Sequence, residues 1–213
     1  MLKKVILAVL VVSCLGYWLW QRPVSHGPGV MAPDPPRQQR CMGLKVIQHK
    51  GVAITPLAHF EMTGRVLHAK RYWFDKEAKL SPVDLAMGWG PMSDERVLED
   101  ISIKQMGRFY FWSTPSLPIP QVEIIRNSAN MHMIPANDAV RYRLRGVKRG
   151  HIVHLKGYLV MARDEAGAIW MSSLTRDDCG DGACEVIWVE EFTILKDPKP
   201  ASPRRALDAA AGY

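Results

Sequence analysis

The chain has 213 residues, which is enough for one folded domain with terminal extensions. Hydrophobic residues make up 47% of it and charged residues 23%, which excludes a disordered chain and a protein with many membrane spans. The formal net charge is +7, but residues 41–196 contain 20 basic and 18 acidic residues, so most of the excess lies at the two ends. A domain-wide basic surface of the kind that binds nucleic acid is therefore not expected.

The N-terminal segment has the charge pattern of a membrane anchor. Lys3 and Lys4 precede an uncharged stretch from Val5 to Trp20. Lysines that flank such a stretch stay on the cytoplasmic side, and aromatic residues at its far end favour the headgroup region. We therefore expect residues 1–22 to form an uncleaved signal-anchor that contacts a membrane through residues 5–20 and places the following domain outside the cytoplasm.

Three other interpretations of this segment stay open. Val11 to Cys14 match the lipobox of bacterial lipoproteins, which makes Cys14 the alternative lipidation site. Cleavage as an ordinary signal peptide is disfavoured because residues 15–20 are bulky. A helix buried in the core of the domain is the last alternative.

Composition divides the rest of the chain into three parts. Residues 23–40 are rich in proline and poor in large apolar residues, which predicts an extended spacer. Residues 197–213 are expected to form a disordered tail. One domain is expected over residues 41–196.

Hydropathy patterns within this domain predict an α+β fold. The expected strands are Leu44–Gln48, His59–Phe74, Ile103–Trp112, Ile152–Arg163, Ala168–Leu174 and Glu185–Leu195. The expected helices are 82–87, 94–101, 120–127 and 138–145, three of which follow a Ser, Asp or Asn suited to capping. The order of these elements predicts a curled antiparallel sheet or a small, OB-like barrel with short helices, with Gly157 at a bulge or bend.

Three stretches of the domain resemble segments of an uncharacterised family of bacterial membrane-anchored proteins. They are LSPVDLAMGWGPMSD, SANMHMIPAN and SSLTRDDCGDGACEVIWVE. The resemblance implies a bacterial origin and no particular activity. Together with the anchor it predicts a single-pass protein of the bacterial inner membrane, with its domain in the periplasm or outside the cell.

Cysteine spacing predicts a disulfide bond. Cys179 and Cys184 flank a four-residue segment with two glycines, a spacing that brings two sulfur atoms together across a turn. Cys41 is left over. Asp177, Asp178 and Asp181 form an acidic turn that lacks the ligand pattern of a calcium loop, so no metal or cofactor is predicted.

The segment around His132 is the best candidate for catalysis. Asn130 and His132 lie two residues apart, so in an extended segment they share a face. With Arg176 as anion binder and Asp177 as carboxylate partner, they predict a small hydrolase as the alternative function, and Ser172, Ser173 or Thr175 would supply a nucleophile. A structural histidine in a turn is the competing interpretation.

The last candidate surface is basic. Arg141, Arg145 and Arg149 recur at helical spacing and predict a basic helix face. No phosphate-binding loop, nucleophile elbow or HExxH motif occurs in the sequence. The favoured function is therefore a non-catalytic binding or scaffolding module of a bacterial envelope assembly, with a protein partner. An OB-like nucleic-acid binder ranks third, after the hydrolase.

Overall fold

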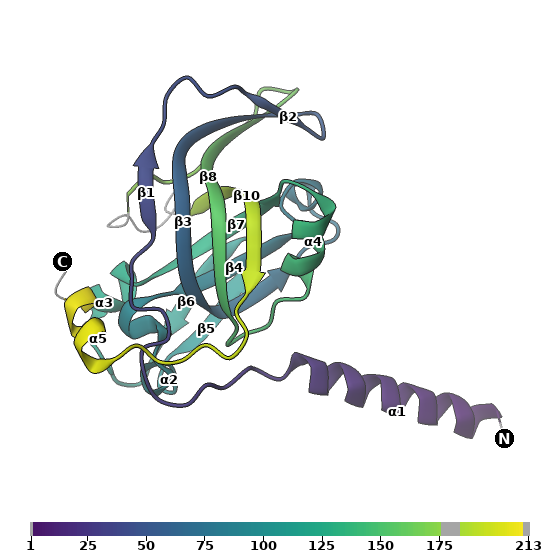
Figure 1. Cartoon of the computed structure of the whole chain (residues 1–213). Helices are drawn as coiled ribbons and strands as arrows, with labels where there is room; N and C mark the ends of the chain where they lie inside the picture. The colour runs from purple at the N-terminus through teal and green to yellow at the C-terminus, as the bar shows by residue number, and fades with distance from the viewer. Residues whose placement is uncertain (1, 176–183, 211–213) are drawn as a thin grey trace.

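The structure is a computed structural model of the chain, and it describes residues 2–175 and 184–210. Its main element is a strongly curled, eight-stranded mixed sheet with a few short helices around it (Figure 1). The strands are β1 (Arg37–Arg40), β2 (Ile47–His49), β3 (Val52–Arg71), β4 (Val83–Gly88), β7 (Ser128–Pro135), β8 (Ile152–Asp164), β9 (Ile169–Met171) and β10 (Glu185–Ile194). The predicted α+β class is confirmed.

A separate hairpin and several short helices accompany the sheet. The hairpin consists of β5 (Ser102–Met106) and β6 (Phe109–Ser113). The α-helices are α1 (Leu2–Gln21), α2 (Glu95–Leu98), α3 (Gln121–Arg126), α4 (Asp138–Arg145) and α5 (Pro203–Ala210), and the 3-10 helices are η1 (Lys76–Lys79) and η2 (Gly90–Ser93). The predicted helix 138–145 is confirmed as α4, with Asn137 as its capping residue.

The sheet curls because the long strand β3 pairs with both β8 and β4, which are joined to each other through other strands. Residues 52–65 of β3 pair with β8, and residues 65–71 pair with β4. From β4 the pairing continues through β7 and β10 to β8, so the path returns to β3. β7 and β10 run parallel, whereas the other pairings among the described strands are antiparallel.

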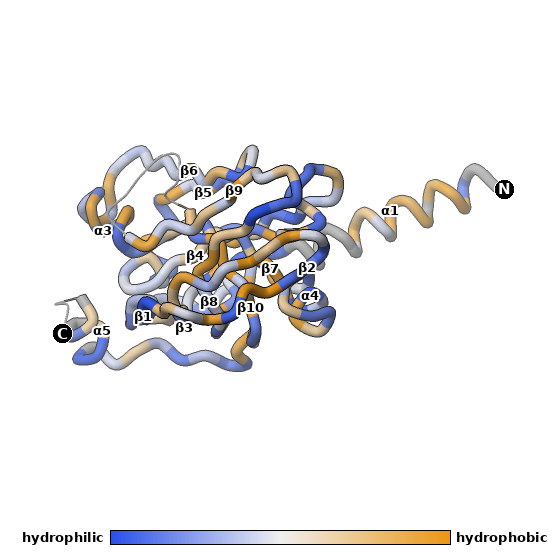
Figure 2. Tube along the Cα trace, turned by 90° about the horizontal axis from the view of Figure 1, so that it is seen from above, coloured by the Kyte–Doolittle hydropathy of each residue, from blue (hydrophilic) through white to orange (hydrophobic). Residues whose placement is uncertain are grey.

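The interior of the curled sheet is the main hydrophobic core. Alternate residues of each strand point inward, as the two-residue period of a strand requires. On β7 these are Met131 and Met133, which are fully buried together with Leu85 of β4, Leu159 of β8 and Ile187 of β10. Hydrophobic colouring runs along these strands in Figure 2. The residues between them, including Asn130 and His132, therefore lie on the outer face of the sheet.

A close approach of two strands requires glycine at position 157. Gly157 of β8 pairs with Val189 of β10, where the register shifts by one residue at a bulge. A Cβ atom at this position would overlap the backbone carbonyl oxygen of Trp188. The predicted irregularity at Gly157 is confirmed, although the extra residue lies on the partner strand.

The β5–β6 hairpin covers part of the outer face of the sheet. A second apolar cluster joins it to the sheet, to α2 and to α3, and includes Leu67, Ala86, Met92, Leu98, Ile101, Ile103 and Ile124. This cluster fixes the position of the hairpin relative to β4 and β7. The turn of the hairpin therefore lies beside the polar residues of those two strands.

Both ends of the chain contact the domain. The N–H of Val24 donates to the carbonyl of Arg149 (2.9 Å), and the N–H groups of Met31 and Ala32 donate to Ser93 Oγ. At the other end, the N–H of Ala201 donates to the carbonyl of Val30 (2.8 Å). The folded unit thus includes parts of the predicted spacer and tail in addition to residues 41–196.

The predicted membrane anchor is wrong. In the part of the chain that the structure describes, no helix meets the length and hydropathy needed to cross a membrane. The apolar stretch from Val5 to Trp20 would measure about 24 Å as a helix, which is shorter than a hydrocarbon core of about 30 Å. The finding also contradicts the single-pass topology and the inner-membrane location derived from it. The helix α1 projects away from the curled sheet (Figure 1).

Candidate active site

A pocket of about 700 Å³ opens on the outer face of the sheet. Five parts of the chain form its walls: the start of β3, the β3–β4 connection, the β5–β6 turn, β7, and the region from β8 to the residue before β10. The lining residues are Val52, Lys76, Glu77, Leu80, Gly107, Arg108, Phe109, His132, Ala162, Asp164, Ala168, Ile169, Trp170, Met171 and Cys184. Two of them, His132 and Cys184, are groups that catalyse acyl transfer in other proteins.

His132 forms an ion pair with Asp84. The two residues are directly opposite each other in the antiparallel pairing of β4 with β7, so their side chains leave the sheet on the same face. His132 Nδ1 lies 3.0 Å from Asp84 Oδ2, and both side chains are buried. This contact fixes the orientation of the imidazole and leaves its Nε2 for a second partner.

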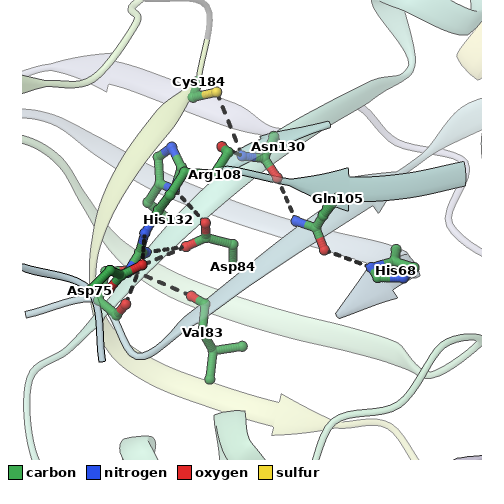
Figure 3. Close-up of polar contacts among 10 residues, drawn as sticks. His68, Asp75, Val83, Asp84, Gln105, Arg108, Asn130, His132 and Cys184 are labelled. Atoms are coloured by element: carbon green, nitrogen blue, oxygen red, sulfur yellow. Dashed lines mark hydrogen bonds and ion pairs between the residues drawn. The ribbon is translucent and has the colours of Figure 1, made fainter. Parts of the chain in front are cut away.

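The second partner of His132 is Cys184, which directly precedes β10. Glu185 of β10 pairs with Met131 of β7, so the preceding residue lies beside Asn130 and close to His132. The thiol lies in the wall of the same pocket as His132 and raises the pKa of the histidine, and Asn130 Nδ2 donates to Cys184 Sγ (3.6 Å). Neighbouring positions on β4, on β7 and just before β10 thus bring a carboxylate, an imidazole and a thiol close together (Figure 3).

The predicted disulfide bond is wrong. Cys184 carries a free thiol in the structure, and so do Cys14 and Cys41. The sulfur of Cys184 faces Asn130 and His132 in the pocket instead of a second sulfur atom. The predicted partner, Cys179, lies outside the described residues.

The surroundings of His132 stabilise its protonated form. Burial lowers its pKa, but the interactions with Asp84 and Cys184 outweigh the burial and raise the pKa to about 9. The ring of Trp170 lies 4.7 Å from the imidazole, centroid to centroid, and closes one side of the site. With this pKa, His132 carries a positive charge at neutral pH.

Arg108 is the second cation that faces Asp84. Its Nη1 donates to Asp84 Oδ1 (2.9 Å) and to the carbonyl of Ser81 (3.0 Å), and its guanidinium makes two hydrogen bonds to the carboxylate of Asp75. The guanidinium also lies 3.8 Å above the ring of Tyr72. The fully buried charge of Asp84 is thus balanced by two cations, which offsets its desolvation.

The β5–β6 turn delivers Arg108 to this position. Gly107 and Arg108 both have positive φ angles, 56° and 70°, as a two-residue hairpin turn of the I′ type requires. In this conformation the carbonyl oxygen of Arg108 accepts a hydrogen bond from Asn130 Nδ2 (2.9 Å). The backbone of the turn is therefore joined to β7, and the side chain of Arg108 joins the turn to β4.

A chain of amide hydrogen bonds extends from the thiol toward the surface. Asn130 Oδ1 accepts from Gln105 Nε2, and Gln105 Oε1 accepts from His68 Nδ1 (2.9 Å). Figure 3 shows this chain of contacts; Asn130 and Gln105 are buried, whereas His68 is half-buried. These contacts fix the amide of Asn130, so that its N–H groups point at Cys184 and at Arg108.

The sequence predicted part of this site. His132 and Asn130 lie together on the outer face of β7, as expected from their spacing. Arg176 and Asp177 lie outside the described residues, as do Asp178 and Asp181. Asp84, which pairs with both His132 and Arg108, was not predicted as a site residue, nor was Arg108, and Cys184 was predicted only as half of a disulfide.

The other predicted residues lie outside this cluster. Ser172 is buried and donates to the carbonyl of Ser173, and its oxygen accepts from the N–H of Val186, so it has a structural role. Arg141 and Arg145 lie on α4, where Arg141 is near Asp138 and Arg145 stacks on Trp73. The third arginine of the predicted basic face, Arg149, follows the end of α4. Cys14 is exposed on α1.

Comparisons with protein-family models, with curated proteins and with solved structures found no match to this chain. A functional assignment therefore depends on the geometry of the site.

Proposed function

We propose that the protein is a thiol-dependent hydrolase or acyltransferase with Cys184 as its nucleophile. The observation that carries this proposal is the position of His132, which forms an ion pair with Asp84 and lies beside Cys184 in the wall of a pocket. A nucleophile, a base and a group that orients the base are the three parts that covalent acyl transfer requires. The hydrolase was the second interpretation of the sequence, with His132 already at its centre.

In the proposed reaction, the thiolate of Cys184 attacks the carbonyl carbon of an acyl compound. The tetrahedral intermediate collapses to a thioester on Cys184, and the leaving group departs with a proton from His132. A water molecule, or an acceptor alcohol or amine in a transferase, then gives a proton to His132 and attacks the thioester. This second step releases the acyl product and restores the pair of thiolate and imidazolium.

The neighbouring residues have supporting roles in this scheme. Asp84 holds the imidazole in one orientation and stabilises its positive charge. Asn130 donates to the sulfur, which positions the thiolate, and an amide at this place is also suited to stabilise a developing oxyanion. Arg108 balances Asp84 and is itself held by Asp75, so we assign it to the support of the site.

The path of the strands supports an OB-type barrel as the scaffold. Taken in chain order, β3, β4, β7, β8 and β10 are the five strands that close on themselves, and the third and fifth of them pair in parallel. Helix α4 connects the third strand to the fourth. OB folds bind ligands on the face of the second and third strands, between two of their loops. Asp84 and His132 lie on the corresponding strands, β4 and β7.

The charges around the pocket favour the hydrolase over a nucleic-acid binder. Lys76 pairs with Asp164 (3.0 Å), and Arg108 pairs with Asp75 and Asp84. Glu77 adds a carboxylate to the lining. A pocket with these charges has no excess of cations with which to bind phosphates.

The test of this proposal is acylation of Cys184 by p-nitrophenyl acetate. We expect the purified chain to release p-nitrophenol and to carry an acetyl group on Cys184, detected by peptide mass spectrometry. Cys184→Ala should abolish both signals, and His132→Gln should lower the rate of release by about 10²–10⁴-fold. The matched control is Cys41→Ser, which removes another free thiol and should behave like the wild type.

A non-catalytic binding module would give the opposite result. In that case Cys184→Ala would release p-nitrophenol as fast as the wild type, or no acetyl group would be found on Cys184 in the folded protein. Circular dichroism of each variant would establish that the fold is intact before the rates are compared.

A further inference from the structure

The pocket beside Cys184 has apolar walls. Around the catalytic groups its lining is formed by Val52, Leu80, Phe109, Ala162, Ile169, Trp170 and Met171. Trp170 contacts both the pocket and the ring of His132, so the apolar surface begins directly at the reacting groups. A ligand that fills this space must therefore present apolar surface close to its reactive carbon.

Each of the three cations of the lining, Lys76, Arg108 and His132, already faces a carboxylate, so none is left over for an anionic substrate. Lys76 is paired with Asp164, and Arg108 with two carboxylates. The carboxylate of Glu77, also part of the lining, would repel an acidic group. These charges disfavour acyl groups that end in a carboxylate or phosphate.

The apolar surface continues from the pocket to the exterior. Phe109, Ile169 and Met171 line the pocket, yet they are 43%, 53% and 58% exposed. Met106 pairs with Phe109 across the hairpin and is 70% exposed, and Phe111 follows on the same face of β6. These five side chains form an apolar rim, which extends the path of a ligand beyond the pocket itself.

We propose that the substrate is an ester or thioester of a long, uncharged, apolar acyl group. Its carbonyl carbon lies at Cys184, the first part of its chain fills the pocket next to Trp170, and the remainder crosses the apolar rim. This inference rests on the proposed function, because it assigns the substrate class of the same site.

A chain-length series tests the substrate class. We expect kcat/KM to rise from p-nitrophenyl acetate through the butyrate to the octanoate, by about threefold to fourfold for each methylene group that becomes buried. Ile169→Asn should lower the ratio of octanoate to acetate kcat/KM by about tenfold, because it places an amide on the path of the chain. The matched control is Leu117→Asn, since Leu117 is also 53% exposed but does not line the pocket, and its ratio should equal that of the wild type.

A binding measurement separates this inference from the proposed function. In Cys184→Ala, where no acylation takes place, isothermal titration calorimetry should show octanamide binding at least about tenfold more tightly than butanamide. Equal affinities, or equal kcat/KM for all three esters, would overturn the apolar acyl substrate and leave Cys184 as a nucleophile. Absence of an acyl group on Cys184 with every ester would overturn the proposed function instead.

Discussion

Asp84 and His132 are opposite each other on neighbouring antiparallel strands, and their side chains meet at 3.0 Å on the outer face of the curled sheet. The strands that carry them are held in register by inward-facing residues on either side, such as Leu85 and Met133. The core therefore positions the ion pair, because a one-residue shift of either strand would turn its side chain of the pair into the apolar interior and leave the other on the outer face.

This relationship makes Asp84→Asn an informative substitution. The amide keeps the size of the carboxylate but removes the charge that stabilises the imidazolium, and it leaves Arg108 with one carboxylate fewer. We expect the rate of p-nitrophenol release to fall by about 10²–10⁴-fold and the free energy of unfolding to fall by about 3–5 kcal/mol. The control is Asp100→Asn, at an exposed position. It should leave the rate of p-nitrophenol release unchanged and change the free energy of unfolding by no more than about 0.5 kcal/mol.

A second prediction concerns the dependence of stability on pH. The groups that face His132 are Asp84 from β4, Cys184 from the start of β10 and the ring of Trp170, with Arg108 on the far side of Asp84. The folded pKa of His132 is about 9, above its ordinary value of 6.5. The resulting stabilisation, about 3 kcal/mol, is complete below about pH 6.5 and is lost as the pH rises through 9.

Denaturant unfolding of the wild type and of His132→Gln at several pH values measures this effect. The difference in free energy of unfolding between the two proteins should shrink as the pH rises from 6.5 to 9.5. A difference that stays constant over this range would show that the histidine is uncharged in the folded state at neutral pH.

The sequence predicted the site only where a local pattern carried the information. The spacing of Asn130 and His132 placed both on one face of an extended segment, which β7 confirms. Asp84 was instead expected at the start of a helix over 82–87, because Ser81 and Pro82 resemble a helix cap. The structure has strand β4 there, buried along its whole length, so that prediction was wrong. The sequence did contain a signal for Asp84 as a site residue, because it is the one acidic residue in the apolar run VDLAMGW. A charge inside a buried strand requires a partner.

Other parts of the site depend on contacts between distant segments. Ile103–Trp112 was expected as one strand, but Gly107 and Arg108 divide it into a hairpin whose turn holds Arg108 beside Asp84. The sequence Gly-Arg lacks the Asn-Gly or Asp-Gly pair that typifies such turns, which is why the turn was missed. Cys184 was assigned to a disulfide because spacing alone carries no information about the register of β10 against β7.

A third prediction follows from the close approach of β8 and β10. Gly157→Ala places a methyl group against the backbone carbonyl of Trp188. To relieve this overlap, β8 and β10 must move apart, which disturbs the hydrogen bonds between them. We expect a loss of about 1–3 kcal/mol in the free energy of unfolding. Gly16→Ala is the control, because no other group lies within 4 Å of a Cβ atom at that position. Equal stabilities of Gly157→Ala and the wild type would mean that the bulge opens at little cost.

The last prediction is a double-mutant cycle between Arg108 and Asp84. Arg108→Met removes a cation from a fully buried carboxylate and also breaks the pair with Asp75, so on its own it should cost about 3–5 kcal/mol. When Asp84→Asn is already present, the same change no longer leaves an excess negative charge in the interior. The double variant should therefore be more stable than the sum of the two single effects predicts, with a coupling of about 1–3 kcal/mol.

The control cycle combines Arg108→Met with Asp75→Asn. Asp75 is half-buried and reached by solvent, so its coupling energy with Arg108 should be about 1 kcal/mol or less. Equal coupling energies in the two cycles would show that Arg108 does not mainly compensate the buried charge of Asp84. Its main contribution would then be to hold the β5–β6 turn in place.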